Sequence, residues 1–72
     1  MEVDAVGLLC PIPVLRLANA LRVRPPGAVA LLRATDPASV EDVHAYCRET
    51  HSELLEMRRE GETHLFLVRK GS

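Results

Sequence analysis

Residues 3–14 decide the fold and read Val3-Asp4-Ala5-Val6-Gly7-Leu8-Leu9-Cys10-Pro11-Ile12-Pro13-Val14. Residues 2–6 are predicted to form a short strand. Apolar residues then recur at i, i+3, i+4 and i+7, which is the spacing of one helical face. These are Val14, Leu17, Ala18 and Leu21. Because proline is tolerated in the first helical turn, we predict Cys10 as the N-cap, followed by Pro11 and Pro13 inside the turn. The stretch therefore places a thiol at the start of a helix.

This position bears on the chemistry of Cys10. Backbone N–H groups at a helix N-terminus favour a thiolate, which is the nucleophilic form of cysteine. The prolines leave Ile12 as the first-turn N–H best placed to reach the sulfur, so we expect a modestly lowered pKa of Cys10. Arg16, one helical turn beyond Ile12, either adds positive potential or lies in solvent. The Pro-x-Pro frame fixes φ twice and presents the thiol outward.

The rest of the chain continues the alternation of strands and helices. After the predicted end of the first helix near Arg24, Pro25-Pro26-Gly27 breaks the chain, and an apolar run over 28–32 predicts a second strand. Asp36 as N-cap and Pro37 predict a second helix that ends near Thr50. Its expected apolar stripe is Val40, Val43, His44 and Cys47.

Two strands follow the second helix. From Glu53 the pattern has period two, with Leu55 and Met57 on one side. After a turn at 61–62, the run 63–69 has apolar residues on both sides and predicts an interior strand. The order β-α-β-α-β-β predicts an α+β two-layer sandwich, with two helices on one face of a four-stranded mixed sheet.

Length and composition limit the function classes. The 72 residues predict one domain, 1–72, and no apolar run approaches the roughly 20 residues of a membrane span. The opening residues lack a secretory pattern, so we expect a cytoplasmic protein with two reduced thiols. A net charge of −1 and 3% aromatic residues disfavour direct nucleic-acid binding.

Several residues allow a structural interpretation beside a functional one. Cys47 lies on an apolar stripe and is expected in the core. Asp4 either orients the loop before Cys10 or faces solvent. Gly7 provides either a positive φ or room for close approach. A metal site is only weakly indicated, because the cysteines and histidines show no more than a loose Cys47-x-x-x-His51 spacing. We therefore expect no metal and no cofactor.

The stretch 3–14 resembles the signature of the TusA-like (SirA-like) sulfur-carrier family, a Leu-Asp-x-x-Gly-Leu-x-Cys-Pro-x-Pro pattern, with Val3 for the leucine. The segment Ala34-Thr35-Asp36-Pro37, with Asp42 beyond it, and the ending 67–71 also resemble family members. The resemblance covers nearly the whole chain and implies a sheet order of 1-2-4-3. It implies that Cys10 is the catalytic residue. The motif-supporting residues would be Asp4, Gly7, Pro11, Ile12, Pro13 and Arg16.

By this resemblance, Cys10 accepts sulfane sulfur as a persulfide and passes it to a partner. The implied donor is a protein of the cysteine desulfurase or rhodanese type, and the implied acceptor is DsrE-like or similar. tRNA thiolation, cofactor sulfuration and sulfur oxidation stay open as pathways, and we expect a monomer. We leave open whether such a sulfurtransferase-type carrier counts as an enzyme. The alternative is a partner-binding or regulatory module that uses the Cys-Pro-x-Pro loop for docking without carrying sulfur. A third hypothesis, an RNA-contacting domain by analogy of fold, is disfavoured by the charge and composition.

Overall fold

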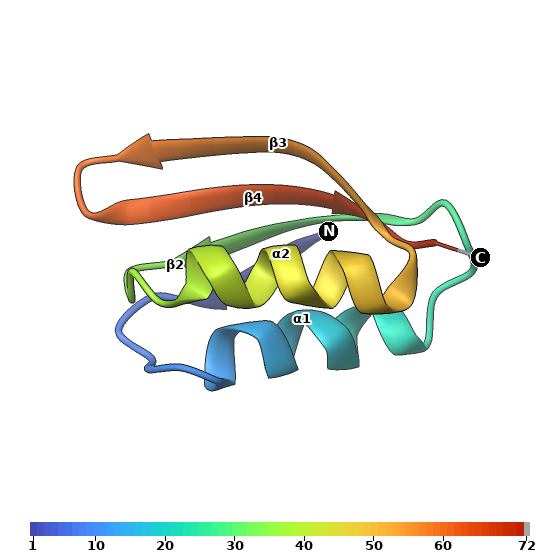
Figure 1. Ribbon diagram of the computed structural model, residues 1–72, viewed down its shortest axis with the longest axis horizontal. Helices are drawn as coiled ribbons and strands as arrows, with labels where there is room; N and C mark the ends of the chain where they lie inside the picture. Colours follow the sequence, from blue (N-terminus) through green and yellow to red (C-terminus); the bar gives the residue numbers. More distant parts are fainter. Residues whose placement is uncertain (72) are drawn as a thin grey trace.

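The computed structural model describes residues 1–71, which form a four-stranded sheet with two helices on one of its faces (Figure 1). The elements are β1 (Glu2–Ala5), α1 (Ile12–Arg22), β2 (Val29–Ala34), α2 (Ser39–Thr50), β3 (Glu53–Glu60) and β4 (Thr63–Arg69). The sheet order is β1-β2-β4-β3, in which β1 and β2 are parallel and the other neighbours are antiparallel. This confirms the predicted α+β sandwich and its interior last strand. Ser72, the last residue of the predicted domain, lies outside the described residues.

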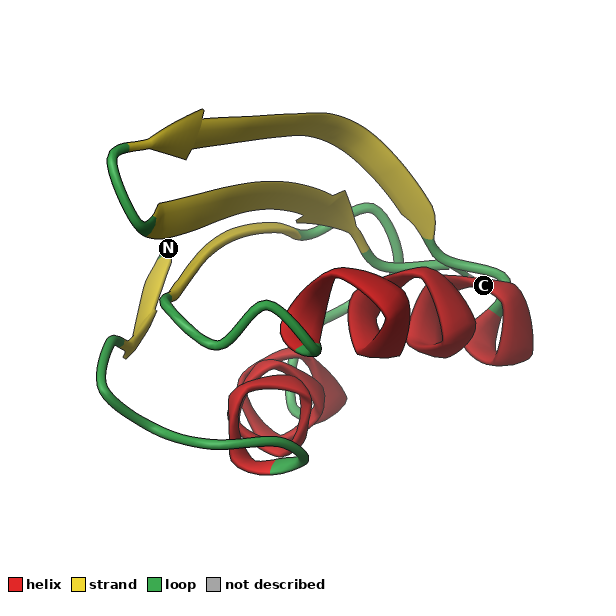
Figure 2. Cartoon of the chain, turned by 60° about the vertical axis from the view of Figure 1, so that its left-hand side comes forward, coloured by secondary structure: helices red, strands yellow, loops and turns green. Residues whose placement is uncertain are grey.

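Both helices lie on the same side of the sheet (Figure 2), and the core is packed between them and the sheet. Its buried apolar residues are Val3, Ala5, Leu17, Leu21, Ala30, Leu32, Ala34, Val43, Cys47, Phe66 and Val68. Each large side chain that is fully buried contributes about 1.5–3 kcal/mol of transfer free energy. This packing fixes α1 against β1 and β2, and with it the loop that carries Cys10. Among residues 1–71, no helix has the length and hydropathy needed to cross a membrane.

Strand β3 differs from the predicted alternation at one residue. A β-bulge between Leu54 and Glu56 leaves Leu55 without a partner on β4. Leu54 therefore pairs with Val68 and Met57 pairs with Phe66, so Leu54 and Met57 share the helix side. The predicted alternation, which placed Leu54 and Met57 on opposite sides of the strand, was wrong, because one extra residue shifts every later side chain to the other face. Leu54 packs against the core, whereas Leu55 and Met57 are exposed.

Helix α2 begins later than predicted. Its N-cap is Ala38, and Asp36 accepts the Ala38 N–H in the turn just before the helix. The predicted stripe was wrong about His44, which is exposed while Val43 and Cys47 are buried. Helix α1 ends at Arg22, two residues before the predicted end. The N-terminal ends of both helices lie near the same loop, and this proximity determines the surroundings of the thiol.

Candidate functional site

Cys10 lies in the loop that connects β1 to α1, and its side chain is exposed. The Cys10–Pro11 peptide bond is cis. The N-cap of α1 is Pro11, so the prediction that Cys10 is the N-cap was wrong by one residue. Ile12 donates its N–H to the carbonyl of Leu9 at 2.8 Å, in a turn that closes over Cys10 and Pro11. Because that N–H is already bonded, it does not reach the sulfur as the sequence suggested.

The loop before Cys10 is held by side chains at both of its ends. Asp4 accepts the N–H of Val6 at 3.0 Å, which favours the loop-orienting interpretation of Asp4. Gly7 has φ +82° and donates its N–H to the hydroxyl of Thr35 at 2.9 Å. A Cβ at position 7 would have no other atom within 4 Å, so the requirement is the positive φ rather than a close approach. The path of the loop is therefore set from β1 and from the end of β2.

Asp36 connects the Cys10 loop to the start of α2. One carboxylate oxygen accepts the backbone N–H of Cys10 at 2.7 Å, and the other accepts the N–H of Ala38 at 3.0 Å. These two hydrogen bonds, with Cys10 the larger cause, lower the pKa of Asp36. The sequence predicted this residue only as the N-cap of α2, which in the structure is Ala38. Asp36 instead bonds the turn before the helix and fixes the backbone of Cys10.

Asp42 contacts the thiol itself. The sulfur of Cys10 donates a hydrogen bond to Oδ2 of Asp42, with Sγ and Oδ2 2.6 Å apart. This hydrogen bond raises the pKa of Cys10, and partial desolvation and the negative charges of Asp42 and Asp36 act in the same direction. The expectation of a lowered pKa was therefore wrong. A hydrogen bond donated by the thiol stabilises its protonated form, and nearby like charges disfavour the thiolate.

The remaining motif residues have distinct places. Arg16 donates from its guanidinium to the backbone carbonyl of Asp4 at 3.1 Å, which ties α1 to the end of β1. Pro13, the second residue of α1, is buried, whereas Pro11 and Ile12 are exposed. The Pro-x-Pro frame therefore has one ring anchored in the core and one at the surface. The roles of these residues in sulfur chemistry stay predictions.

Three contacts around the thiol loop were not predicted from the sequence. These are the contacts of Thr35 with Gly7, of Asp36 with the Cys10 N–H and of Asp42 with the Cys10 thiol. The resemblance of 34–37 and Asp42 to family members was the available signal, but no local pattern shows that residues 26, 28 and 32 positions apart come together. The structure brings this second segment against the first.

Cys47 is 7% exposed in the core, and its burial raises its pKa. Its placement confirms the core interpretation. Among residues 1–71, no group of three or more His, Cys, Asp or Glu side chains is arranged to hold a metal ion.

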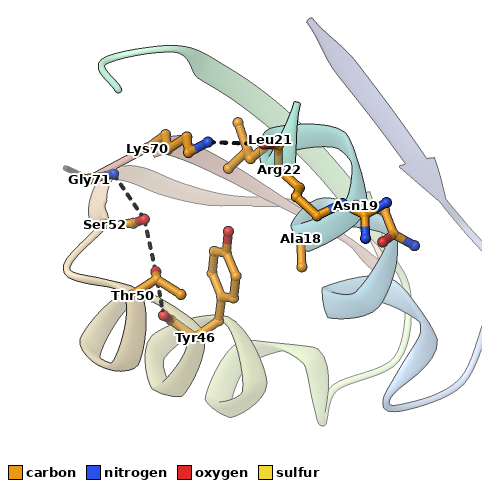
Figure 3. A pocket seen from close by; sticks show the side chains of 9 residues that line it. All are labelled: Ala18, Asn19, Leu21, Arg22, Tyr46, Thr50, Ser52, Lys70 and Gly71. Atoms are coloured by element: carbon orange, nitrogen blue, oxygen red, sulfur yellow. Dashed lines mark hydrogen bonds between the residues drawn. The ribbon is translucent and has the colours of Figure 1, made fainter. Parts of the chain in front are cut away.

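Two hollows lie along the pair of helices. The one in Figure 3 has a volume of about 390 Å³ and lies at their C-terminal ends, around Tyr46. Lys70 donates there to the carbonyl of Arg24 at 2.5 Å, and Gly71 donates to the Ser52 hydroxyl at 3.1 Å. A shallower groove of about 260 Å³ starts beside the thiol loop. It is lined by Pro11, Val14, Leu15, Ala18, Asp42, Ala45, Tyr46 and Glu49.

The fold and site together define a small α+β domain with an exposed cysteine in a loop before a helix. Asp42 contacts the thiol of this cysteine, and Asp36 accepts its backbone N–H. The family model for Sulfurtransferase TusA matches residues 1–70. The sulfur carrier protein TusA of Allochromatium vinosum is 44% identical over 96% of this chain and 91% of its own length. The protein of that name from Pseudomonas fluorescens is 38% identical over 96% of this chain and 83% of its own length.

A solved structure agrees with these relatives. The SirA-like protein from Desulfitobacterium hafniense superposes with a TM-score of 0.78 at 26% identity, covering 99% of this chain and 97% of its own. The chain therefore belongs to the TusA family of sulfurtransferases. The resemblance noted from residues 3–14 is confirmed.

Proposed function

We propose that this chain is a sulfur-relay protein that holds sulfane sulfur as a persulfide on Cys10. Membership of the TusA family supports a sulfur-relay role and implies protein donors and acceptors of sulfur. The observation that carries the assignment to one residue is the placement of Cys10. It is the exposed cysteine, it lies within the family motif, and its backbone is fixed by Asp36.

The transfer step is a thiolate exchange. The Cys10 sulfur attacks the outer sulfur of the donor's persulfide, and a new S–S bond forms as the donor's own S–S bond breaks. The electron pair of the broken bond leaves on the donor's cysteine sulfur, which then takes up a proton. No external oxidant or reductant is needed. The same exchange, with Cys10 persulfide as the donor, passes the sulfur to the acceptor.

The surface around Cys10 suits contact with another protein. Leu9, next to it in the chain, is 72% exposed, and Val6, Ile12 and Leu15 are exposed large apolar residues of the same loop and helix. Exposed apolar groups close together favour a protein interface. We propose a donor of the cysteine desulfurase or rhodanese type and an acceptor that is DsrE-like or similar. The carrier would act as a cytoplasmic monomer, and its pathway would be tRNA thiolation, cofactor sulfuration or sulfur oxidation, depending on the acceptor.

Intact-protein mass spectrometry tests this proposal. The protein is incubated with a cysteine desulfurase plus cysteine, or with a rhodanese plus thiosulfate, and compared with Cys10→Ser and Cys47→Ser. We expect one reductant-sensitive sulfur adduct in the wild type and in Cys47→Ser, and none in Cys10→Ser. If Cys10 alkylates readily but no donor loads it, the carrier proposal fails and the docking module becomes the better explanation.

A further inference from the structure

The hydrogen bond between Cys10 and Asp42 exists only in one protonation state of the thiol. The sulfur is the donor and Oδ2 of Asp42 is the acceptor, 2.6 Å apart. A thiolate has no hydrogen to donate, and it would face the carboxylate as a second negative charge. The contact therefore belongs to the unloaded, protonated carrier.

The other charged groups around the loop do not offset this effect. Asp36 presents a second carboxylate to Cys10 and is held there by two backbone N–H groups. The guanidinium of Arg16, on α1, donates instead to the backbone carbonyl of Asp4. The carboxylate of Asp4 accepts the N–H of Val6. The charges that act on the thiol are thus those of Asp42 and Asp36.

A thiol in this state is a poor nucleophile. An ordinary cysteine, with a pKa of about 8.5, is roughly 3% thiolate at pH 7, and a raised pKa leaves less. Sulfur transfer needs the thiolate. An event at the site that removes the effect of the carboxylate would therefore speed the attack by Cys10.

The groove beside the loop indicates what that event is. Asp42 and Glu49 contribute two carboxylates to it, and none of the residues that line it in the described chain is cationic. Its other lining residues include the apolar side chains of Val14, Leu15 and Ala45. A donor segment with a cationic side chain among apolar ones complements this groove in charge and polarity. Pairing of that cation with Asp42 would remove the acceptor of the thiol hydrogen bond.

Building on the carrier function proposed above, we propose that Asp42 holds unloaded Cys10 as the thiol until a lysine or arginine of the sulfur donor pairs with the Asp42 carboxylate. The released proton goes to solvent, and the thiolate then attacks the donor persulfide as described above. In the loaded state Sγ is bonded to carbon and sulfur and has no hydrogen for Asp42. The charge of the persulfide then sits one S–S bond, about 2.05 Å, farther out, and repulsion from Asp42 directs it toward the acceptor.

The first arm of the test needs no sulfur donor. The rate of iodoacetamide alkylation of Cys10 is measured against pH in the Cys47→Ser background, with and without Asp42→Asn, and with Glu49→Gln as the control in the same groove. Urea unfolding verifies that each variant is folded. We expect Asp42→Asn to move the midpoint of the profile to lower pH and to speed alkylation several-fold at pH 7, while Glu49→Gln stays close to the wild type. A profile for Asp42→Asn that coincides with the wild type, or moves to higher pH, overturns the proposal.

The second arm compares two sources of sulfur, glutathione persulfide and a cysteine desulfurase supplied with cysteine. Asp42→Asn should load faster than the wild type from the small persulfide, since the thiol is no longer held. It should load more slowly from the protein donor, since the partner of the donor's cation is gone. Equal acceleration with both sources overturns the role of a donor cation. If the wild type loads from neither source, the carrier function fails, while the alkylation profiles still decide the effect of Asp42 on the thiol.

Discussion

Gly7→Ala tests whether the loop conformation at the thiol requires glycine. The residue has φ +82°, and an added Cβ would meet nothing within 4 Å, so strain in the backbone is the main effect of the substitution. A left-handed conformation disfavours an L-residue by about 1–2 kcal/mol. Replacing glycine also restricts the unfolded chain, which offsets about 0.4–1 kcal/mol of that loss. We expect a net destabilisation of roughly 1 kcal/mol, or a melting temperature lower by about 4–8 °C for a domain of this size.

The chain contains a matched control for this substitution. Gly27 has φ +92° and equally open space, but it donates to Lys70 in the loop before β2 rather than near Cys10. Gly27→Ala should lose similar stability and leave the alkylation of Cys10 unchanged. Gly7→Ala should in addition speed alkylation at pH 7, because a strained Gly7–Thr35 hydrogen bond loosens the contact of Cys10 with Asp42. Melting curves and iodoacetamide rates measure both effects. Unchanged stability of Gly7→Ala beside a destabilised Gly27→Ala refutes the reasoning about position 7.

Three further predictions concern the packing and the charges that hold the site. Cys47→Ser buries a hydroxyl in the core and should destabilise the fold by about 1–3 kcal/mol in urea unfolding while sulfur loading persists; lost loading in the folded variant would contradict this. Leu17→Ala should lose about 2–5 kcal/mol, whereas the exposed Leu15→Ala should change stability by less than about 0.5 kcal/mol, and equal losses would argue against the assigned helix face. Since the pKa of Asp36 is lowered by its N–H donors, its charged form adds stability above the ordinary aspartate pKa of about 3.9, and that stability is lost as pH falls through the folded pKa. Asp36→Asn should therefore be less stable than the wild type at pH 6 and approach it near pH 2, and a constant difference across this range would contradict the linkage.

The sequence was sufficient for the architecture because each element carries its own local signal. Helical spacing from Val14 onward, the break at 25–27 and the alternation over 63–69 depend on residues that are near neighbours in the chain. The bulge at Leu55 has no such signal, since it is defined by pairing with β4. This one unpaired residue places the side chains that follow it in β3 on the opposite face of the sheet from the one predicted.

The sequence identified the candidate nucleophile, but it did not predict the charges around that residue. Cys10 and its prolines form a continuous motif, so the nucleophile could be named from the sequence. The state of its thiol depends on Asp36 and Asp42, which the fold brings from α2 and the turn before it. The prediction from the sequence took account of the helix N-terminus but of neither Asp36 nor Asp42. It therefore predicted the wrong direction for the pKa of Cys10.

The most direct measurement for the relay function follows one labelled sulfur atom through the protein. Sulfur-34 is loaded from a cysteine desulfurase supplied with labelled cysteine, the donor is removed, and a DsrE-like acceptor is added. Peptide mass spectrometry then locates the label over time. A relay through Cys10 predicts that the label appears on Cys10, leaves it as the acceptor gains it, and is never transferred by Cys10→Ser. Label that reaches the acceptor equally well through Cys10→Ser, or that never appears on Cys10, would rule out a relay through this residue.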